Sequence, residues 1–81
     1  MAWVYILQSL KDKKYYIGST RDLTRRLAEH NRGQNKSTKH RKPFKLIYQE
    51  EFEEISDAKN KEKIIKSYKG GNAFKKLINN K

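Results

Sequence analysis

One carboxylate occupies an unexpected position in this sequence. A helix is predicted over residues 57–69, and its inward apolar stripe consists of Ala58, Ile65 and Tyr68. Glu62 falls on the same stripe. A carboxylate that faces a protein core is strongly destabilised unless it is paired or binds a metal ion. Glu62 is therefore expected to bind a metal ion or to pair with an arginine, unless the stripe is rotated and the side chain is exposed.

Two tyrosines, one arginine and one histidine could also take part in chemistry. Tyr5 and Tyr16 lie in predicted strands, where tyrosine is common simply because its ring packs well. Arg26 could form a salt bridge with Asp22 four residues earlier, and His30 could be an ordinary helix-end residue beside the C-terminal dipole. Taken singly, none of these residues establishes a catalytic site.

The residue types limit which metal ion the chain could hold. The sequence contains no cysteine, and its two histidines are His30 and His40. These counts exclude a disulfide framework and thiolate ligands, and they argue against a structural zinc site. Any metal ion is therefore expected to be held mainly by oxygen atoms.

The chain is strongly basic, with a formal net charge of +11 and a pI of about 10.0. Residues 1–49 hold twelve Lys and Arg residues against three acids, whereas residues 50–81 hold eight against six. Cationic side chains that neutralise phosphates release condensed counterions, so this charge favours a nucleic acid as partner. A membrane surface fits less well, because the basic residues do not line one face of a long amphipathic helix.

The basic residues expected to contact nucleic acid lie directly before the first predicted helix, within it and in the stretch that follows it. That stretch, residues 32–43, contains no acid. The alternative is a solvated basic surface such as small ribosome-associated proteins carry. The predicted contact residues are Arg21, Arg25, Arg32, Lys36, Lys39, His40, Arg41 and Lys42.

The apolar pattern predicts an α+β fold of order ββαβαα. Ser19 and Thr20 are the expected N-cap hydroxyls of the first helix, Ser56 or Asp57 should cap the second, and Asn72 should cap the third. The strands are predicted over residues 3–8, 15–18 and 44–52, and the helices over residues 22–30, 57–69 and from 72 onward.

The length of 81 residues predicts one domain, residues 1–81, with a thin core. No apolar run approaches the roughly 18 to 20 residues that cross a bilayer, and no basic N-terminal signal precedes an apolar stretch. We therefore expect a soluble cytoplasmic protein that is monomeric by default.

Taken together, these features resemble the GIY-YIG nucleases. The resemblance covers nearly the whole chain and is closest to the small single-domain bacterial members. It is carried by Val4-Tyr5-Ile6, Tyr16-Ile17-Gly18, the run from Ser19 to Leu27, Glu29-His30-Asn31 with Gly33, the Arg41-Lys42-Pro43 turn, and Glu62.

The resemblance implies a sandwich-like α/β arrangement, in which helices flank a small three-stranded antiparallel sheet. It also implies site residues: Tyr5 and Tyr16 match the motif tyrosines, Arg26 the helix arginine, His30 a position that holds His or Tyr, and Glu62 the metal-binding glutamate. In such nucleases one Mg²⁺ or Mn²⁺ on the glutamate contacts the scissile phosphate. A tyrosine assists proton removal from water, and the arginine stabilises developing negative charge.

A tyrosine that acts as a base near neutral pH needs its pKa lowered by roughly 2 to 3 units from about 10. Three departures from the family pattern also matter. Trp3 replaces the opening glycine of many members, and Ser19 stands where the nucleotide-excision-repair members carry lysine. The asparagine that usually follows the glutamate has no clear match, because Asn72 comes early and Asn79 late.

Two functions follow from the sequence. The first is a metal-dependent endonuclease that acts on DNA rather than RNA, and double-strand cutting by one small site would then need a dimer. The second is a non-catalytic module that keeps the fold and binds DNA or RNA. Convergence of Tyr5, Tyr16, Arg26 and Glu62 on one pocket would favour catalysis, whereas a Glu62–Arg26 pair would favour binding alone.

Overall fold

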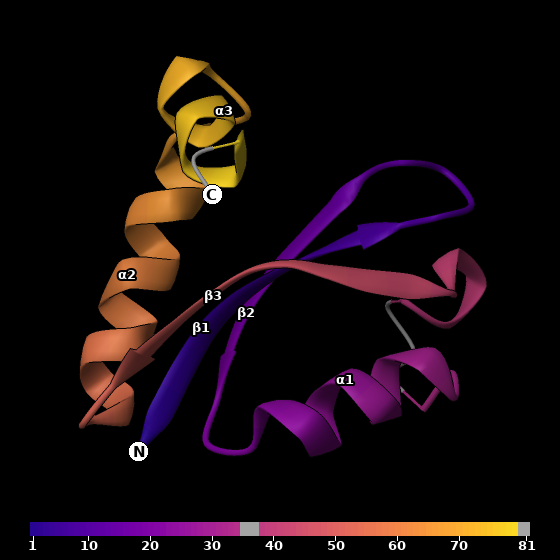
Figure 1. Cartoon of the computed structure of the whole chain (residues 1–81), viewed down its shortest axis with the longest axis horizontal. Helices are drawn as coiled ribbons and strands as arrows, with labels where there is room; N and C mark the ends of the chain where they lie inside the picture. The colour runs from indigo at the N-terminus through magenta and orange to yellow at the C-terminus, as the bar shows by residue number, and fades with distance from the viewer. Residues whose placement is uncertain (35–37, 80–81) are drawn as a thin grey trace.

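Three strands and three α-helices make up the chain in the computed structural model, which describes residues 1–34 and 38–79 (Figure 1). The antiparallel sheet has the order β2-β1-β3. The predicted α+β fold of order ββαβαα is therefore confirmed, and a short 3₁₀ turn, η1, precedes β3. The elements are β1 (Ala2–Ser9), β2 (Tyr15–Thr20), α1 (Leu23–Asn31), η1 (Lys39–Arg41), β3 (Phe44–Phe52), α2 (Ile55–Ser67) and α3 (Asn72–Asn79).

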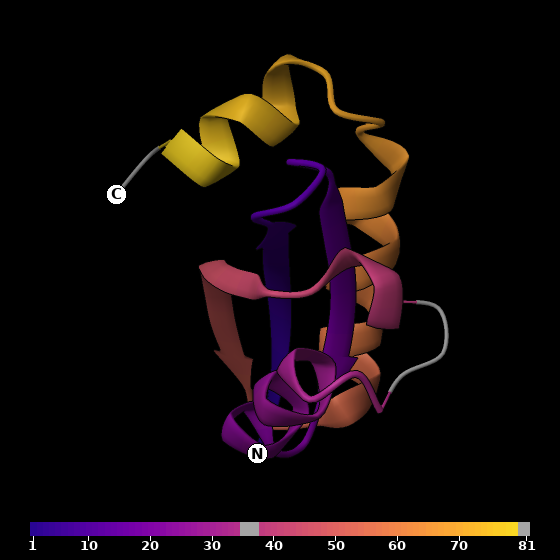
Figure 2. The ribbon, with the colours of Figure 1, turned by 90° about the vertical axis from the view of Figure 1, so that its right-hand side faces the viewer.

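The sheet is covered on both faces. Helix α1 lies against one face, and α2 and α3 lie against the other (Figures 1 and 2). Because side chains of a strand alternate between faces, Val4 and Ile6 of β1 pack toward α2 and α3, while Tyr5 and Leu7 pack toward α1. Among the described helices, none is long and apolar enough to cross a membrane.

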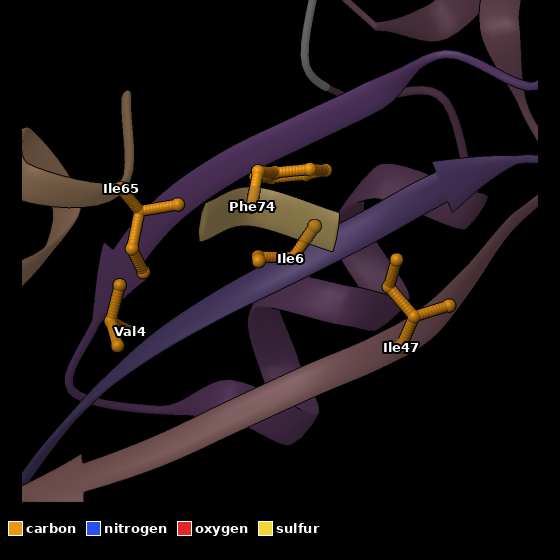
Figure 3. Close-up of a cluster of buried hydrophobic side chains, with 5 residues drawn as sticks. All are labelled: Val4, Ile6, Ile47, Ile65 and Phe74. Atoms are coloured by element: carbon orange, nitrogen blue, oxygen red, sulfur yellow. The ribbon is translucent and has the colours of Figure 1, made fainter. Parts of the chain in front are cut away.

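The core under α2 and α3 is formed by aliphatic side chains and one phenylalanine (Figure 3). Ile65 of α2 and Phe74 of α3 are buried against Val4 and Ile6 of β1 and Ile47 of β3. Each such side chain contributes about 1.5–3 kcal/mol when fully buried. This cluster fixes α2, and therefore Glu62, relative to the sheet.

The core under α1 is built around Tyr5, Leu7 and Phe44. Leu23 and Leu27 of α1 pack against it, as the apolar spacing of that helix predicts.

A β-bulge changes the expected pattern of β3. In a regular strand, where side chains alternate between faces, Tyr48 would share a face with Phe44 and Leu46. The register shifts opposite Ile6 and Leu7, because Ile6 pairs with Tyr48 while Leu7 pairs with Leu46. Tyr48 therefore packs against the α2 and α3 core.

The start of α1 differs from the prediction. Ser19 and Thr20 do not cap the helix, because both residues belong to β2 and pair with β1. Asp22 is the N-cap instead, and its Oδ1 accepts a hydrogen bond from the backbone N–H of Arg25 at 3.1 Å. Strand pairing across the sheet therefore overrides the capping preference of the two hydroxyl residues.

The boundaries of α2 and α3 also shift. Helix α2 begins at Ile55 after Glu54, so Ser56 and Asp57 lie in its first turn rather than at its cap. It ends at Ser67, earlier than the predicted residue 69, because Lys69 and Gly70 adopt left-handed backbone angles, with φ of 51° and 74°. Asn72 is the first residue of α3 and not the cap before it.

Gly18 is required by the close approach of a ring rather than by a bend. It lies inside β2 opposite Tyr5, and a Cβ atom at this position would be 2.6 Å from Tyr5 Oη and 2.8 Å from Tyr5 Cζ. The Tyr5 ring therefore lies directly over the backbone of Gly18, where no other residue leaves room for it.

We predict that Gly18→Ala lowers the free energy of unfolding by about 1–3 kcal/mol, because the Tyr5 ring must move out of a packed position. Urea denaturation followed by circular dichroism measures this loss. In the double variant Gly18→Ala/Tyr5→Leu the two effects should be clearly less than additive. A wild-type denaturation midpoint for Gly18→Ala would contradict this account of the glycine.

Candidate functional site

Four of the predicted site residues meet on the α1 side of the sheet. Tyr5 of β1, Tyr16 of β2 and His30 of α1 form a cluster of rings. The ring centroid of Tyr16 lies 4.8 Å from that of His30 and 6.3 Å from that of Tyr5. Arg26, one turn before His30 in α1, reaches the hydroxyl groups of both tyrosines.

His30 lies in the last turn of α1, as expected, but it is fully buried rather than an ordinary residue at the helix surface. Its Nε2 lies 3.3 Å from Tyr5 Oη, and its Nδ1 lies 2.9 Å from Thr38 Oγ1. Burial lowers the pKa of His30 below 6.5, and the positive charge of Arg26 lowers it further. The neutral ring then accepts one of these hydrogen bonds and donates the other.

Tyr5 does not have the properties of a base. It is 1% exposed, and this burial raises its pKa above 10.0 even though a hydrogen bond from Arg26 acts in the opposite direction. A base needs a lowered pKa, so the shift at Tyr5 has the wrong sign. Its hydroxyl instead connects Arg26 to His30.

Arg26 pairs differently from the expectation. Asp22 caps α1, and Arg26 Nη1 donates to Glu29 Oε1 at 3.2 Å. Arg25, four residues before Glu29, also pairs with that carboxylate, at 3.0 Å. Because the Arg26 guanidinium also interacts with the Tyr5 and Tyr16 hydroxyls, which raise its pKa, it lies between the ring cluster and the surface.

Glu62 reaches the site from the opposite face of the sheet. The predicted inward stripe of α2 is present, with Ala58 and Ile65 fully buried and the Glu62 side chain 20% exposed. Its partners are not arginines. Ser19 Oγ donates to Glu62 Oε1 at 2.7 Å, and Lys66 Nζ lies 2.7 Å from Glu62 Oε2. The predicted alternative of an arginine ion pair is therefore wrong.

The edge strand β2 connects Glu62 on the α2 side of the sheet with the residues on the α1 side. Ser19, which holds Glu62, also lines an open cleft of about 310 Å³ at the junction of β2 and α1. The charge of Glu62 acts on Tyr5 across this edge and contributes to the raised pKa of that tyrosine, after burial and Tyr16. The full cleft lining is Ser19, Thr20, Arg21, Asp22, Arg25, Arg26 and Glu29.

The donor atoms at Glu62 suit only one kind of metal site. Within residues 1–34 and 38–79, no group of three or more His, Asp or Glu side chains could hold an ion. Glu62 and the hydroxyl of Ser19 offer hard oxygen atoms, and Mg²⁺ is commonly bound by one or two carboxylates together with water and substrate phosphate oxygens. These residues fit such an open site and do not fit a closed structural one.

The predicted nucleic-acid contacts fall into three groups. Arg21 and Arg25 are exposed and line the cleft. Arg32 follows α1 and is exposed, and so are Lys39, His40 and Lys42 in and beside η1. Arg41 differs, because it is partly buried and its Nε bonds Asp12 Oδ2 at 3.1 Å. Lys36 lies outside the described residues.

Two residues of this site were not singled out for these roles in the sequence. The sequence predicts Ser19 as a helix cap, at a position where some family members carry lysine, yet it is the hydrogen-bond donor to Glu62. Lys66 is absent from the predicted site, although its i+4 spacing from Glu62 on a predicted helix indicates an ion pair.

Comparison with known proteins agrees with this arrangement. The model of the GIY-YIG catalytic domain matches residues 1–76. The chain belongs to the GIY-YIG family. The predicted resemblance is thereby confirmed, and this membership places the chain in a nuclease-type family whose members are expected to interact with nucleic acid.

Individual GIY-YIG relatives are small bacterial proteins. The chain is 44% identical over 69 residues to a UPF0213 protein of Streptococcus pneumoniae, covering 84% of this chain and 69% of the relative. It is 40% identical over 67 residues to a UPF0213 protein of Staphylococcus saprophyticus, covering 82% and 80%. The solution NMR structure of the UPF0213 protein BH0048 from Bacillus halodurans superposes with a TM-score of 0.61 at 32% identity, covering 100% of this chain and 86% of that one.

We predict that the stability of this GIY-YIG chain falls as the pH is lowered from 7.5 to 5.5. The pKa of His30 is depressed by folding, so its contribution is complete above about 6.5 and is lost as the pH falls toward the folded-state pKa. The loss is at most about 1.4 kcal/mol for each pH unit.

Urea denaturation at several pH values measures this loss. His30→Gln should flatten the pH dependence, and the exposed His40→Gln is the matched control that should keep the wild-type slope. Equal slopes for wild type and His30→Gln would show that the buried imidazole does not titrate as described.

Proposed function

We propose that this chain is an endonuclease that requires a divalent metal ion and hydrolyses phosphodiester bonds of DNA. The observation that supports the proposal is the convergence of two groups of side chains at the edge strand β2. Tyr5, Tyr16 and Arg26 approach it from the α1 side, and Glu62 approaches it from the α2 side through Ser19. The cationic cleft beside them is open to a phosphate backbone.

Arg26 is the residue we assign to the phosphate. Its side chain is 35% exposed and lines the cleft, and a guanidinium offers a planar fork of donors that matches phosphate oxygens. Its fixed position among Tyr5, Tyr16 and Glu29 means that little reorganisation is needed when negative charge develops. The exposed Arg21 and Arg25 would hold the neighbouring phosphates.

Tyr16, rather than Tyr5, is assigned to the attacking water. Tyr5 is fully buried and its pKa is raised, whereas Tyr16 is partly exposed. Both hydroxyls are in reach of Arg26, and the neutral His30 packs against both rings. Tyr5 and His30 would therefore position Tyr16 and Arg26 without exchanging a proton with the substrate.

Glu62 is assigned to the metal ion, with Ser19 holding its carboxylate in place. A bound Mg²⁺ or Mn²⁺ would polarise the scissile phosphate and stabilise the charge that develops on it. Lys66 now occupies the position of a counterion at 2.7 Å from Oε2.

The alternative is a module that binds nucleic acid and does not cut it. It is favoured by one observation, since both carboxylate oxygens of Glu62 already have partners, Ser19 and Lys66. The two functions share the cationic cleft and differ only in whether Glu62 accepts a metal ion.

We predict nicking of supercoiled plasmid or a branched duplex that depends on Mg²⁺ or Mn²⁺. Glu62→Gln and Tyr16→Phe should each reduce the rate by roughly 10²-fold or more, because each removes a group acting on the transition state. Gel assays with and without EDTA, with single strands alongside, measure the rates. Glu53→Gln, which changes an exposed carboxylate, is the matched control.

Binding without cleavage under every metal condition would favour the non-catalytic module. Cleavage that survives Glu62→Gln would exclude the assigned site.

We predict that Lys66→Met tightens Mn²⁺ binding about 2- to 5-fold, because the ammonium that competes for Oε2 is removed. The factor reflects a partly exposed ion pair worth below about 1 kcal/mol. Electron paramagnetic resonance of free Mn²⁺ measures the affinity without any substrate.

Lys63→Met is the matched control, since it removes the same charge from an exposed position of the same helix. Equal Mn²⁺ affinities for the Lys66 and Lys63 variants would mean that the Lys66 ammonium does not compete with the metal ion for the Glu62 carboxylate.

A further inference from the structure

The turn between β1 and β2 is fastened to the turn that precedes β3. The buried hydroxyl of Ser9 accepts hydrogen bonds from the backbone N–H groups of Lys11 and Asp12, each at 3.1 Å, and donates to the carbonyl of Arg41 at 2.5 Å. One side chain therefore fixes the shape of the first turn and ties it to the second.

Three further hydrogen bonds join the same two turns. Arg41 donates to the Asp12 carboxylate at 3.1 Å and to the carbonyl of Tyr15 at 3.3 Å. The N–H of Leu10 donates to the carbonyl of Pro43 at 2.9 Å. The two turns thus form one connected surface, called the double-turn surface below. Arg41 links the turns through its side chain and its carbonyl.

This double-turn surface carries a high density of positive charge. Residues 8–15 and 38–45 hold seven Lys and Arg residues and a single acid, Asp12, which Arg41 neutralises. The lysines are all exposed and sit on a backbone that is already ordered, so little backbone entropy is lost when they bind an anion. They are Lys11, Lys13, Lys14, Lys39, Lys42 and Lys45.

The α2 side of the molecule has no comparable excess. Residues 50–79, which include α3 on the same face, hold seven lysines and six acids. Two of these lysines lie within ion-pair distance of acids, Lys61 with Glu50 at 3.9 Å and Lys66 with Glu62 at 2.7 Å. A polyanion is therefore drawn to the side that carries the double-turn surface.

The double-turn surface continues the line that begins at the cleft. Helix α1 runs from the cleft to Asn31. Two residues later, Lys42 Nζ would lie 3.4 Å from a Cβ atom added to Gly33. Figure 2 looks onto this side of the molecule, where α1, η1 and the β1–β2 turn are all visible. The exposed Arg32 is the C-cap of α1, at the end of the helix away from the cleft.

From these observations we infer that the double-turn surface binds the phosphate backbone of a DNA duplex next to the cleft. The largest extent of the molecule is 28 Å, which corresponds to about 8 base pairs at 3.4 Å each. Duplex rather than single-stranded DNA fits, because single-strand binders stack bases on exposed aromatic rings. Among the Phe, Tyr and Trp residues of segments 8–15 and 38–45, Tyr15 at the start of β2 is the one exposed ring, at 41%. It also packs edge-on against Phe74 with ring centroids 5.0 Å apart, so this surface has no row of rings on which successive bases could stack.

The inference takes its class of partner from the proposed function but does not depend on cleavage. It is tested by fluorescence anisotropy with a labelled 20-base-pair duplex in EDTA, over a series of salt concentrations. The variant Lys11→Gln/Lys14→Gln leaves Lys13 intact, since Lys13 has a left-handed φ of 65°. The matched control Lys59→Gln/Lys63→Gln removes the same charge from the exposed side of α2.

The expected result is a weaker complex for the Lys11/Lys14 variant, with the slope of log K against log salt reduced by about 1.8, or 0.9 for each phosphate that is no longer neutralised. The control should keep the wild-type slope. Equal slopes for the two double variants, or tighter binding of a single strand or of anionic vesicles than of the duplex, would overturn the inference. The protein could bind the duplex as expected and still fail to cleave DNA when Mg²⁺ or Mn²⁺ is added. That result would support the inference about the double-turn surface and contradict the nuclease proposal.

Discussion

Burial of β1 on both faces is the constraint on which this structure depends. The strand lies between β2 and β3 and has helices on either side, so its alternate residues serve different cores. Val4 and Ile6 hold α2 and α3, and Tyr5 holds α1. The position of α1 on one face is therefore fixed relative to the positions of α2 and α3 on the other. Groups on opposite sides of the sheet, such as Glu62 and His30, keep their relative positions without touching.

Because β2 is an edge strand of the sheet, residues from its two faces can contribute to one site. In a central strand, residues on opposite faces are separated by the sheet, whereas at an edge they can approach one another around the backbone. Tyr16 and Ser19 point to opposite faces of β2, and Ser19 reaches both the cleft and Glu62. The candidate site therefore lies along the exposed edge of the sheet at β2. It needs residues from both helical layers, because α1 supplies Arg26 and His30 and α2 supplies Glu62.

Much of this arrangement is predictable from local patterns, and the failures have physical reasons. The strands, the inward stripe with Glu62 and the end of α1 follow from periodicity and from glycine. The partner of Glu62 could not be predicted in the same way, because Ser19 lies 43 residues away and is placed by strand pairing. His30 is buried because Thr38 and Tyr5 close over it, and neither contact has a local signature.

The hydroxyl of Ser9 couples two segments that are distant in the sequence. Because it bonds two N–H groups of one turn and a carbonyl of the other, the length of each turn is set by the position of a single atom. An insertion or deletion in either turn would displace that atom's partners in both, whereas side chains that point outward can change freely. The turns can therefore vary in the charge of their outward side chains but not in their length. Related chains would adapt this surface to different partners by substitution of those side chains, not by insertion or deletion.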